Sequence, residues 1–396
     1  MADKALANLK VLDLSHYVAG PYCTRILAGF GANVIKVEKP PGGDPARRIG
    51  PFLGDEPGPE RSVLFLYLNS TKKSITLNLK SPAGLKIMRD LLKDADVLVE
   101  SFKPGTMSRL GLSYEAVRTL NPRLVMTSVS NFGQTGPYRD YKTSHLVTWG
   151  MGIGLYTPDG YGARPLQMGG WVTHYVAGLF AAAATAAAVF QRNKTDNGQH
   201  VDTSMQESIM MMTTFPSVVY SYTGLVHHDI GGKGLGVMTT KDGGYIGPNA
   251  WTRPQIERMF ALLGVPEMAQ DPRFQESTWV ANREEAKEIL KNRIKEWNSR
   301  ELFEKAVEWN VPIAMLPTTK DILESPQHQA RGFFEEVEHP VIGKATMPGA
   351  PFKMMLTPWK TESPAPLLGQ HNTEVICNGL GYTRDDLERL REQGVI

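Results

Sequence analysis

Cysteine is nearly absent from this chain of 396 residues, in which the two cysteines, Cys23 and Cys377, lie far apart. Two distant cysteines provide neither a disulfide framework nor a cluster of metal ligands, so we predict no metal site. The opening residues, MADKALANLK, lack the apolar core of a signal peptide. We therefore expect a protein of the reducing cytoplasm.

An excess of charge of one sign is also missing. The sequence has 43 Lys and Arg against 41 Asp and Glu, which gives a formal net charge of +2. A general nucleic-acid binder would show a basic face or tract, so the composition argues against a nucleic-acid partner. It leaves room for local Lys and Arg pockets that bind a small polyanion.

Long hydrophobic runs are rare. One stretch, residues 171–190, is nearly free of strongly polar side chains. Much of it is alanine, a weak hydrophobe, and His174, Tyr175 and two threonines interrupt a window only just long enough to cross a bilayer. We predict a buried helix of a large core and no membrane partner.

Nucleotide-binding motifs are missing as well. The turn after the first expected strand does not read G-x-G-x-x-G, and no Walker-type G-K-[ST] occurs. A dinucleotide or ATP site is therefore unsupported, although the fold can still resemble a nucleotide-binding sheet.

The first part of the chain contains alternating strand and helix patterns. Apolar or alternating runs predict strands at residues 9–14, 33–38, 74–79, 96–102 and 123–129, with helical patterns between them. This alternation indicates an α/β fold with a mostly parallel sheet, whose ligands bind beyond the carboxyl ends of the strands. The loops at that edge each bring a Lys or Arg or a glycine-rich turn, and together predict a pocket for a phosphate-bearing ligand: residues 16–20, 39–43, 101–109 and 131–142.

The second half changes in composition. Residues 201–215 read as a helix, and the glycine-rich residues 225–244 read as a surface hairpin, a crossover loop or a flap over an active site. Helices with many i,i+4 charge pairs follow from Arg253, which marks a smaller domain over residues 225–330. Strand and turn patterns return from Glu336, and Thr383 is placed to cap a terminal helix.

Residues 168–192 combine a glycine pair with an alanine-rich helix. Gly169 and Gly170 allow a sharp turn and close approach of a ligand, and the helix directs its first N–H groups toward that turn. His174 is the polar side chain at this position. Taken alone, it is either a buried or capping histidine or a reactive group.

Several motifs resemble one family along the whole chain. They are VLDLSHYVAGPYCTRILAGFGANVIKVEKPPGGDPAR, NSTKKSITLNLKSPAG, VESFKPGTMSRLGL and NPRLVMTSVSNFGQTGPYRD, followed late in the chain by QDPRF, SPQHQARGFFEEVEHP and APLLGQHNTEVI. Together they resemble the class III CoA-transferases, the family of formyl-CoA:oxalate and carnitine CoA-transferases. The resemblance implies a Rossmann-like large domain from residues 1–224 and 331–396, a smaller α+β domain between them, and an interlocked-ring dimer.

The resemblance also implies a substrate, coenzyme A or acyl-CoA, and no permanently bound cofactor. The pyrophosphate and 3′-phosphate of CoA would explain the basic loops. Lys39 stands where the family often has Arg, and Ser101 where Asn is common. By motif, the CoA-binding residues would be Tyr17, Val18, Ala19, Lys39, Leu77, Lys80, Ser101, Phe102, Arg109 and Lys142.

The main departure from the family is at position 174. The family has an Asp nucleophile there, whose carboxylate forms a mixed anhydride and then an enzyme-bound CoA thioester. This chain reads THYVAGL, which places His174 at that position. An imidazole attacking the same carbonyl would take the acyl group and release CoA, so the family's route is closed to this chain alone.

Three functions remain open. In the first, the chain is the CoA-binding subunit of a heteromeric CoA-transferase whose sister subunit supplies the Asp. It would transfer CoA from an acyl-CoA such as succinyl-CoA to a carboxylic acid, as in succinyl-CoA:benzylsuccinate-type enzymes of anaerobic aromatic degradation. The apolar residues that would suit an aryl-substituted succinate are Trp149, Met151, Tyr156, Met168 and Trp171.

In the second, the chain is a racemase or isomerase acting at the carbon alpha to a CoA thioester. His145 lies one place after the usual racemase His, where Ser144 stands, and would pair with His174 as a two-base site. In the third, the chain is a non-catalytic CoA-binding scaffold.

Overall fold

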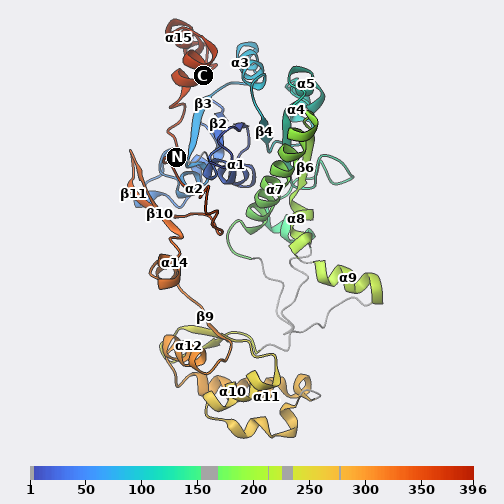
Figure 1. Ribbon diagram of the computed structural model, residues 1–396, viewed down its shortest axis with the longest axis vertical. Helices are drawn as coiled ribbons and strands as arrows, with labels where there is room; N and C mark the ends of the chain where they lie inside the picture. The colour runs from blue at the N-terminus through green and yellow to red at the C-terminus, as the bar shows by residue number, and fades with distance from the viewer. Residues whose placement is uncertain (1–3, 153–167, 213, 225–234, 276–277) are drawn as a thin grey trace. The chain divides into compact units, whose positions relative to one another are not determined.

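The computed structural model describes residues 4–152, 168–212, 214–224, 235–275 and 278–396, which form two compact units. The large unit runs to Gly224 and resumes at Arg331, and the small unit includes the residues from Leu225 to Ala330. Figure 1 shows that the blue N-terminal part and the red C-terminal part of the chain both belong to the large unit.

The large unit contains a parallel sheet with helices on both faces and a separate hairpin. Its strands are β1 (Lys10–Asp13), β2 (Asn33–Glu38), β3 (Lys72–Thr76), β4 (Val97–Glu100), β5 (Val125–Ser130), β6 (His200–Ser204), β10 (Phe334–His339) and β11 (Gly343–Pro348). Its helices are α1 (Ala19–Gly29), α2 (Val63–Asn69), α3 (Pro82–Leu92), α4 (Thr106–Arg109), α5 (Tyr114–Leu120), α6 (His145–Met151), α7 (Val172–Thr195), α8 (Met205–Met212), α9 (Thr214–Thr223) and α15 (Arg384–Glu392). The short turns are η1 (Pro45–Arg48), η2 (Leu53–Asp55) and the π-helical η5 (Thr373–Gly379).

The six-stranded sheet has the order β3-β2-β1-β4-β5-β6, and all of its neighbouring strands run parallel. This confirms the predicted parallel α/β sheet. The strand order reverses between β1 and β4, and in such sheets the crevice beyond the carboxyl ends at this switch point is where ligands bind.

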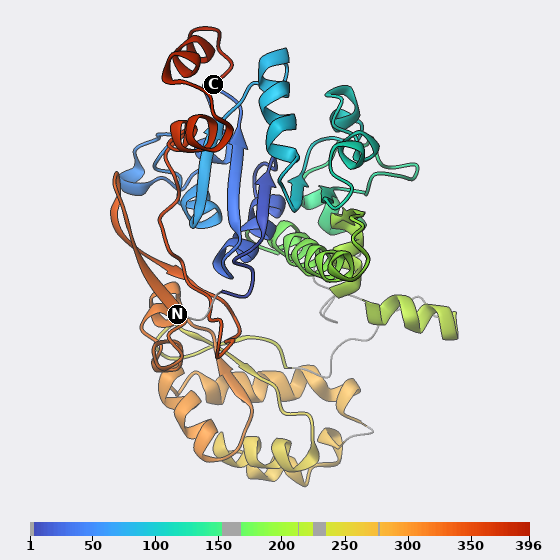
Figure 2. The same cartoon turned by 45° about the horizontal axis from the view of Figure 1, so that its top comes forward.

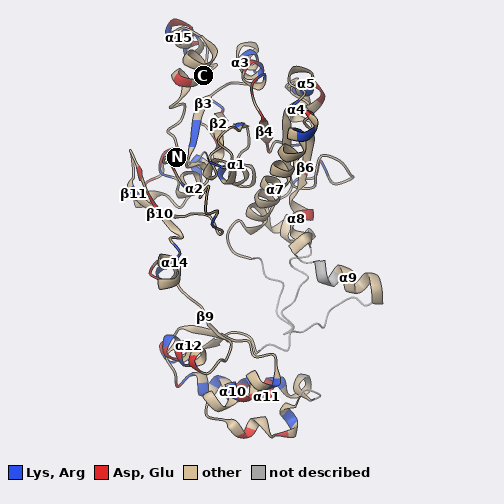
Figure 3. Ribbon diagram, in the orientation of Figure 1, with Lys and Arg blue, Asp and Glu red and all other residues tan. Residues whose placement is uncertain are grey.

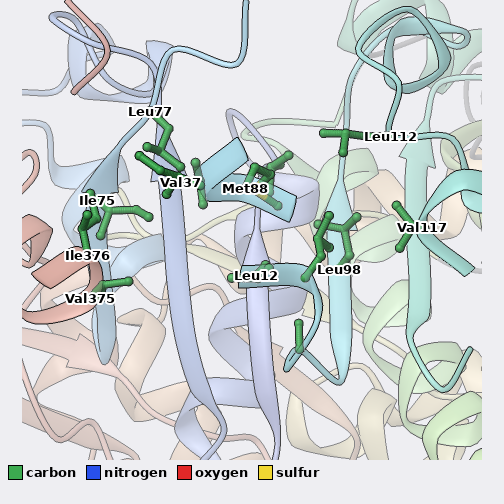
Figure 4. Close-up of a cluster of buried hydrophobic side chains, with 14 of the residues drawn as sticks. Leu12, Val37, Ile75, Leu77, Met88, Leu98, Leu112, Val117, Val375 and Ile376 are labelled. Carbon is green, nitrogen blue, oxygen red and sulfur yellow. The ribbon is translucent and has the colours of Figure 1, made fainter. Parts of the chain in front are cut away.

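Two apolar cores cover the faces of the sheet. Leu12, Val37, Ile75 and Leu98 from the strands, and Leu77 just after β3, pack against Met88 of α3, Val117 of α5 and residues of η5 and α15 (Figure 4). The opposite face packs against α1 and α7, whose contributions are mostly alanine and other small residues. The sheet therefore lies between two helical layers (Figure 2).

Helix α7 is long and apolar enough, by length and composition alone, to cross a membrane. It packs against α1, β5, β6 and α8, and Thr185 on its inner face exchanges a 2.7 Å hydrogen bond with Thr127 of β5. Its buried face therefore packs against the sheet, as expected for a core helix.

The small unit combines a three-stranded antiparallel sheet with helices. Its strands are β7 (Met238–Thr239), β8 (Tyr245–Pro248) and β9 (Ile313–Met315), in the order β7-β8-β9. Its helices are α10 (Arg253–Leu262), α11 (Trp279–Ile294), α12 (Ser299–Glu308), α13 (Thr319–Leu323) and α14 (Pro326–Ala330), with short turns η3 (Pro266–Ala269) and η4 (Pro272–Phe274). Figure 3 shows both charge signs interspersed along α10 to α12, where pairs such as Arg253–Glu257 lie on the surface.

Two sequence predictions need correction. Residues 200–204, expected to lie mostly in a helix, form strand β6, and α8 begins only at Met205. The strand pairs with β5 on one side only, so as an edge strand it can carry polar side chains that conceal the strand pattern. The third strand ends at Thr76 rather than residue 79, because the chain turns there toward the Ser81 cap of α3.

Candidate functional site

The switch point of the sheet is formed by the turns that follow β1 and β4. The backbone N–H of His16 donates a 2.8 Å hydrogen bond to Ser101 Oγ, and the ring of His16 meets Phe102 edge-on at 5.2 Å between centroids. Burial lowers the pKa of His16, so its ring is neutral at pH 7. These contacts hold the two turns together where a ligand of such a sheet is expected.

A cavity of about 170 Å³, which we call the switch-point cavity, opens beside these turns. It is smaller than the 300–1,000 Å³ typical of a whole cofactor site, so it can hold only part of a CoA molecule. It brings together four of the residues that the motifs assign to CoA: Lys39, Leu77, Lys80 and Phe102. The other lining residues are His16, Val37, Glu38, Asn78, Leu79, Thr106 and Leu110.

Basic side chains lie at the switch-point cavity and near the Gly105 turn. Lys39 and Lys80 line it and are exposed. Gly105 adopts φ of +79°, and a Cβ there would lie 3.6 Å from Arg109 Nη1 and 3.8 Å from Arg139 Nη2, so both guanidinium groups flank this turn. Arg139 was missed by motif comparison, although it lies in the expected loop 131–142.

Lys142 is exposed in the loop after β5 and does not line the switch-point cavity. Arg109 Nη2 donates a 2.8 Å hydrogen bond to Thr106 Oγ1, and Thr106 does line it. Of the two, Arg109 is therefore tied more directly to the cavity.

The turn before α1 is held in an unusual conformation. Tyr17 has φ of +63°, which is rare for a residue other than glycine, and its N–H donates a 3.1 Å hydrogen bond to Asp44 Oδ1. The side chains of Val18 and Ala19 are buried. A ligand at this turn would therefore meet the backbone of these two residues rather than their side chains.

A buried charge cluster lies beneath this turn. Asp13 Oδ2 is 3.0 Å from Lys72 Nζ, and Lys36 Nζ is 2.9 Å from Asp44 Oδ2. Lys36 Nζ also donates a 2.9 Å hydrogen bond to the carbonyl of Ser15. Although burial opposes ionisation of Asp13, Lys36 and Lys72 hold its pKa below the usual range. The cluster therefore anchors residues 13–17 from below through charge-assisted hydrogen bonds.

The second candidate site lies at the beginning of α7. A Cβ on Gly178 would come within 2.5 Å of the carbonyl oxygen of Ala19, so only glycine allows α7 to approach the first turn of α1 this closely. His174 precedes Gly178 by one helical turn, on the same face of α7. The face of α7 that holds His174 is therefore also the face that approaches the first turn of α1.

The Gly178→Ala variant tests this close approach. Alanine is a better helix former than glycine by about 1 kcal/mol, but at this position its Cβ would collide with a backbone carbonyl. We expect a net loss of about 1–3 kcal/mol in the free energy of unfolding, measured by urea titration. The matched change Ala186→Gly, at an exposed position of α7, should cost about 1 kcal/mol from helix propensity alone. A Gly178→Ala protein that is more stable than wild type would contradict the close approach of α7 to the Ala19 carbonyl.

His174 belongs to a small group of hydrogen-bonded side chains. Thr173 Oγ1 is 3.4 Å from His174 Nδ1 and is also hydrogen-bonded to His145 Nδ1 from α6. His145 Nε2 lies 3.4 Å from the carbonyl oxygen of Met168, and the two imidazole centroids are 5.7 Å apart. Burial, with a smaller effect from His145, lowers the pKa of His174 to about 4.

The apolar residues expected near the acid substrate differ in exposure. Trp149 is buried at 9% exposure and belongs to the core, whereas Met151 and Met168 are 38% and 51% exposed. Trp171 meets the ring of His174 edge-on, with centroids 5.2 Å apart. Tyr156 and residues 225–234, the first half of the glycine-rich segment, lie outside the described residues.

No group of three or more His, Cys, Asp or Glu side chains is arranged to hold a metal ion among the residues that the structure describes. The functional groups that the two candidate sites bring together are mostly hydroxyl, imidazole and basic side chains.

Comparison with known proteins places these features in context. The sequence profile of CoA-transferase family III matches residues 6–372. The succinyl-CoA–D-citramalate CoA-transferase of Chloroflexus aurantiacus is 34% identical, over 99% of this chain and 98% of the relative. The human succinyl-CoA:glutarate CoA-transferase is 31% identical, over 99% of this chain and 90% of the relative.

A solved structure is similar over nearly the whole length. The crystal structure of a CAIB/BAIF family protein from Brucella suis superposes with a TM-score of 0.85 at 28% identity, covering 95% of this chain and 99% of that one. The likeness therefore extends over both units of the chain.

Proposed function

This chain belongs to CoA-transferase family III, and from that premise we propose that it is the CoA-binding subunit of a CoA-transferase whose sister subunit supplies the nucleophile. The reaction transfers CoA from an acyl-CoA, such as succinyl-CoA, to a carboxylic acid. The single observation that carries the proposal is the imidazole of His174 at the beginning of α7, where the motif resemblance leads us to expect the family's Asp. CoA thioesters are the substrates, and no permanent cofactor is needed.

The switch-point cavity supports the assignment of CoA binding. Its apolar lining, with Leu77 and Phe102, suits part of the adenosine, and the exposed ammonium groups of Lys39 and Lys80 suit phosphates. Arg109 and Arg139, beside Gly105, extend the positive charge along the same edge. We assign CoA to this edge, with the thioester directed toward the turn before α1.

The chemistry of position 174 supports a sister subunit. A carboxylate can take up CoA as its own thioester, but an imidazole nitrogen can accept only the acyl group. The partner we propose is a homologous chain with Asp at this position, joined to this one as an interlocked dimer. The complex would work in the cytoplasm, without nucleic acid or membrane.

The acid substrate is proposed from the apolar residues near His174. Met151 and Met168 are partly exposed, and Trp171 packs against the ring of His174. Adaptable methionines beside a flat aromatic ring suit a bulky acid such as an aryl-substituted succinate. Such a substrate would place the complex in anaerobic aromatic degradation.

The hydrogen bonds of His145 argue against the racemase alternative. Both ring nitrogens of His145 are engaged, one by Thr173 Oγ1 and the other by the carbonyl of Met168. Its ring also shares Thr173 with His174, so the two imidazoles lie beside one another rather than on opposite faces of a substrate carbon. Retention of deuterium at the alpha carbon of an acyl-CoA incubated with the protein would confirm that no racemase acts.

The proposed CoA site predicts a salt-dependent loss of affinity. Replacing Lys39 or Lys80 by Ala removes one charge-assisted contact to phosphate, so we expect the dissociation constant for CoA to rise about 10-fold in each variant. Calorimetric titration at low and high salt measures it, and the effect should shrink at high salt. Lys93→Ala, which removes an exposed ammonium that pairs with Asp90 on α3, is the control and should bind as wild type. Unchanged affinity in both test variants would exclude this cavity.

Native mass analysis of the complex from its source cell tests the heteromeric assembly. We expect this chain together with a homologous chain that carries Asp at the matching position, and CoA transfer only by the pair. A homodimer that transfers CoA without a second chain would contradict the proposal. A homodimer that binds CoA without transferring it would instead indicate a non-catalytic scaffold.

A further inference from the structure

Four groups in the large unit form one hydrogen-bonded series. The carbonyl of Met168, the ring of His145, the hydroxyl of Thr173 and the ring of His174 follow one another, and each neighbouring pair is within hydrogen-bonding distance. Two of the four belong to α7, one to α6 and one to the turn before α7. The series links the nucleophile position of the family to a fixed backbone acceptor.

The direction of each hydrogen bond follows from the backbone end of the series. A carbonyl oxygen only accepts, so His145 Nε2 must carry the proton that it donates to Met168 O. In a neutral ring His145 Nδ1 is then the acceptor, and the Thr173 hydroxyl donates to it. The remaining lone pair of Thr173 Oγ1 accepts from His174 Nδ1–H.

This order leaves the lone pair of His174 on Nε2. A neutral imidazole has one protonated and one bare nitrogen, so assigning the proton to Nδ1 fixes the reactive atom. The pKa of about 4 keeps the ring neutral throughout the physiological range. His145 is the titratable group that lowers this pKa electrostatically, in addition to burial.

We infer that a ligand approaches His174 from the glycine turn before α7. Among the residues that the structure describes, a Cβ on Gly169 or Gly170 would meet no atom within 4 Å. On the other side, the approach of Gly178 to the Ala19 carbonyl places His174 one helical turn from the region where the thioester of a bound acyl-CoA is expected.

We propose that His174 gives this chain an acyl-CoA hydrolase activity of its own, in which Nε2 takes the acyl group from the thioester and passes it to water. The proposal rests on the CoA binding proposed above. The Nε2 lone pair bonds to the carbonyl carbon, the C–S bond breaks, and the thiolate leaves with the electron pair and is protonated by solvent. Water then attacks the acyl carbon, the C–N bond breaks, and the products are the free acid and CoA.

Thr173 and His145 move the proton that this chemistry displaces. Acylation of Nε2 would leave a cationic ring, which burial disfavours. His174 can pass its Nδ1 proton to Thr173 Oγ1 while Thr173 passes its own proton to His145 Nδ1. The result is a neutral acyl-imidazole and an imidazolium on His145 that still donates to Met168 O, and hydrolysis returns the proton. His145 and Thr173 are thus positioning residues.

Thiol release by the purified chain, with acetyl-CoA and succinyl-CoA and corrected for release without protein, tests the proposal. We expect turnover by wild type and none above background by His174→Ala. Thr173→Val should lower kcat roughly 10²-fold with KM unchanged, and Thr173→Ser should restore most of it. Thr119→Val, which removes an exposed hydroxyl bonded to its own helix α5, is the matched control and should not change the rate.

Two further measurements distinguish a chemical role of His174 from a purely structural one. The wild-type kcat should be flat from pH 8 to 6 and fall as the pH approaches 4, where His174 takes up a proton. Rapid quenching should trap protein heavier by the acyl group on the peptide that contains His174.

Equal hydrolysis by wild type and His174→Ala would overturn the proposal. CoA binding without hydrolysis would overturn this activity and leave the transferase subunit standing, whereas no CoA binding would overturn both.

Discussion

The His174→Asp variant is expected to transfer CoA between acids without any second chain. The substitution provides the carboxylate that the proposed function requires, beside the proposed CoA site, so a covalent CoA thioester can form on the side chain. The gain over wild type should be on the order of 10³-fold or more in kcat/KM, because the nucleophile is the group without which the reaction cannot proceed. Transfer from succinyl-CoA to an added acid is followed by chromatography of both CoA thioesters.

The control is His174→Asn, which matches Asp in shape but lacks a nucleophilic oxygen anion. It should fold as the Asp variant does, bind CoA and transfer nothing. Equal inactivity of both variants, with CoA affinity retained, would show that more than the nucleophile has been lost. It would then weaken the view that this chain keeps an intact transferase pocket.

The Asp13→Asn variant is expected to lose about 3–5 kcal/mol of the free energy of unfolding. Asp13 is fully buried between Lys36 and Lys72 and accepts a 2.6 Å hydrogen bond from Thr24 Oγ1. An amide cannot balance the two ammonium groups, and Lys72 would be left with an uncompensated buried charge. Urea titration by circular dichroism measures the loss.

Two further substitutions accompany Asp13→Asn, one as a surface control and one as a milder variant. Asp94→Asn removes an exposed carboxylate that pairs with Lys10 on the surface, and should cost less than about 1 kcal/mol. Thr24→Val is the milder variant should Asp13→Asn fail to accumulate, with an expected cost of about 1–2 kcal/mol. If the urea midpoint of Asp13→Asn is as close to wild type as that of Asp94→Asn, the buried charge cluster does not stabilise the fold as proposed.

The stabilisation by Asp13 also has a defined pH dependence. Its pKa in the folded protein lies below the unfolded value of about 4, because Lys36 and Lys72 outweigh the opposing effect of burial. The contribution is therefore complete above about pH 4 and is lost as the pH falls through the folded pKa. The difference between wild type and Asp13→Asn should shrink in acid.

Strands of the sheet could be predicted from the sequence where they are apolar and flanked by residues that end a strand. The second strand was predicted at residues 33–38, as observed, because the run NVIKVE is followed at once by Lys39, Pro40 and Pro41, which stop a strand. The Ser81 cap of α3 and the Thr383 cap of α15 were also predicted correctly from local chemistry. β6 was missed because an edge strand can remain polar, and its place beside β5 depends on tertiary pairing.

The motifs named candidate residues for the site but not their arrangement. The motifs pointed to Lys39, Leu77, Lys80 and Phe102, which the structure brings to one cavity, although the motifs contain no distances. The sequence suggested His145 only as a racemase base. Its bond to Thr173 depends on how α6 packs against α7, which no local pattern reveals. The sequence offered one sign of this arrangement, the hydroxyl group of Thr173 directly before His174.

We propose that this chain, alone, cannot carry CoA as a thioester on its own side chain. Intact-protein mass analysis after incubating the purified chain with succinyl-CoA tests it most directly. We expect no species heavier by the CoA moiety from the isolated chain, and such a species only on the sister chain when both are present. A CoA adduct on a carboxylate of the isolated chain would contradict it.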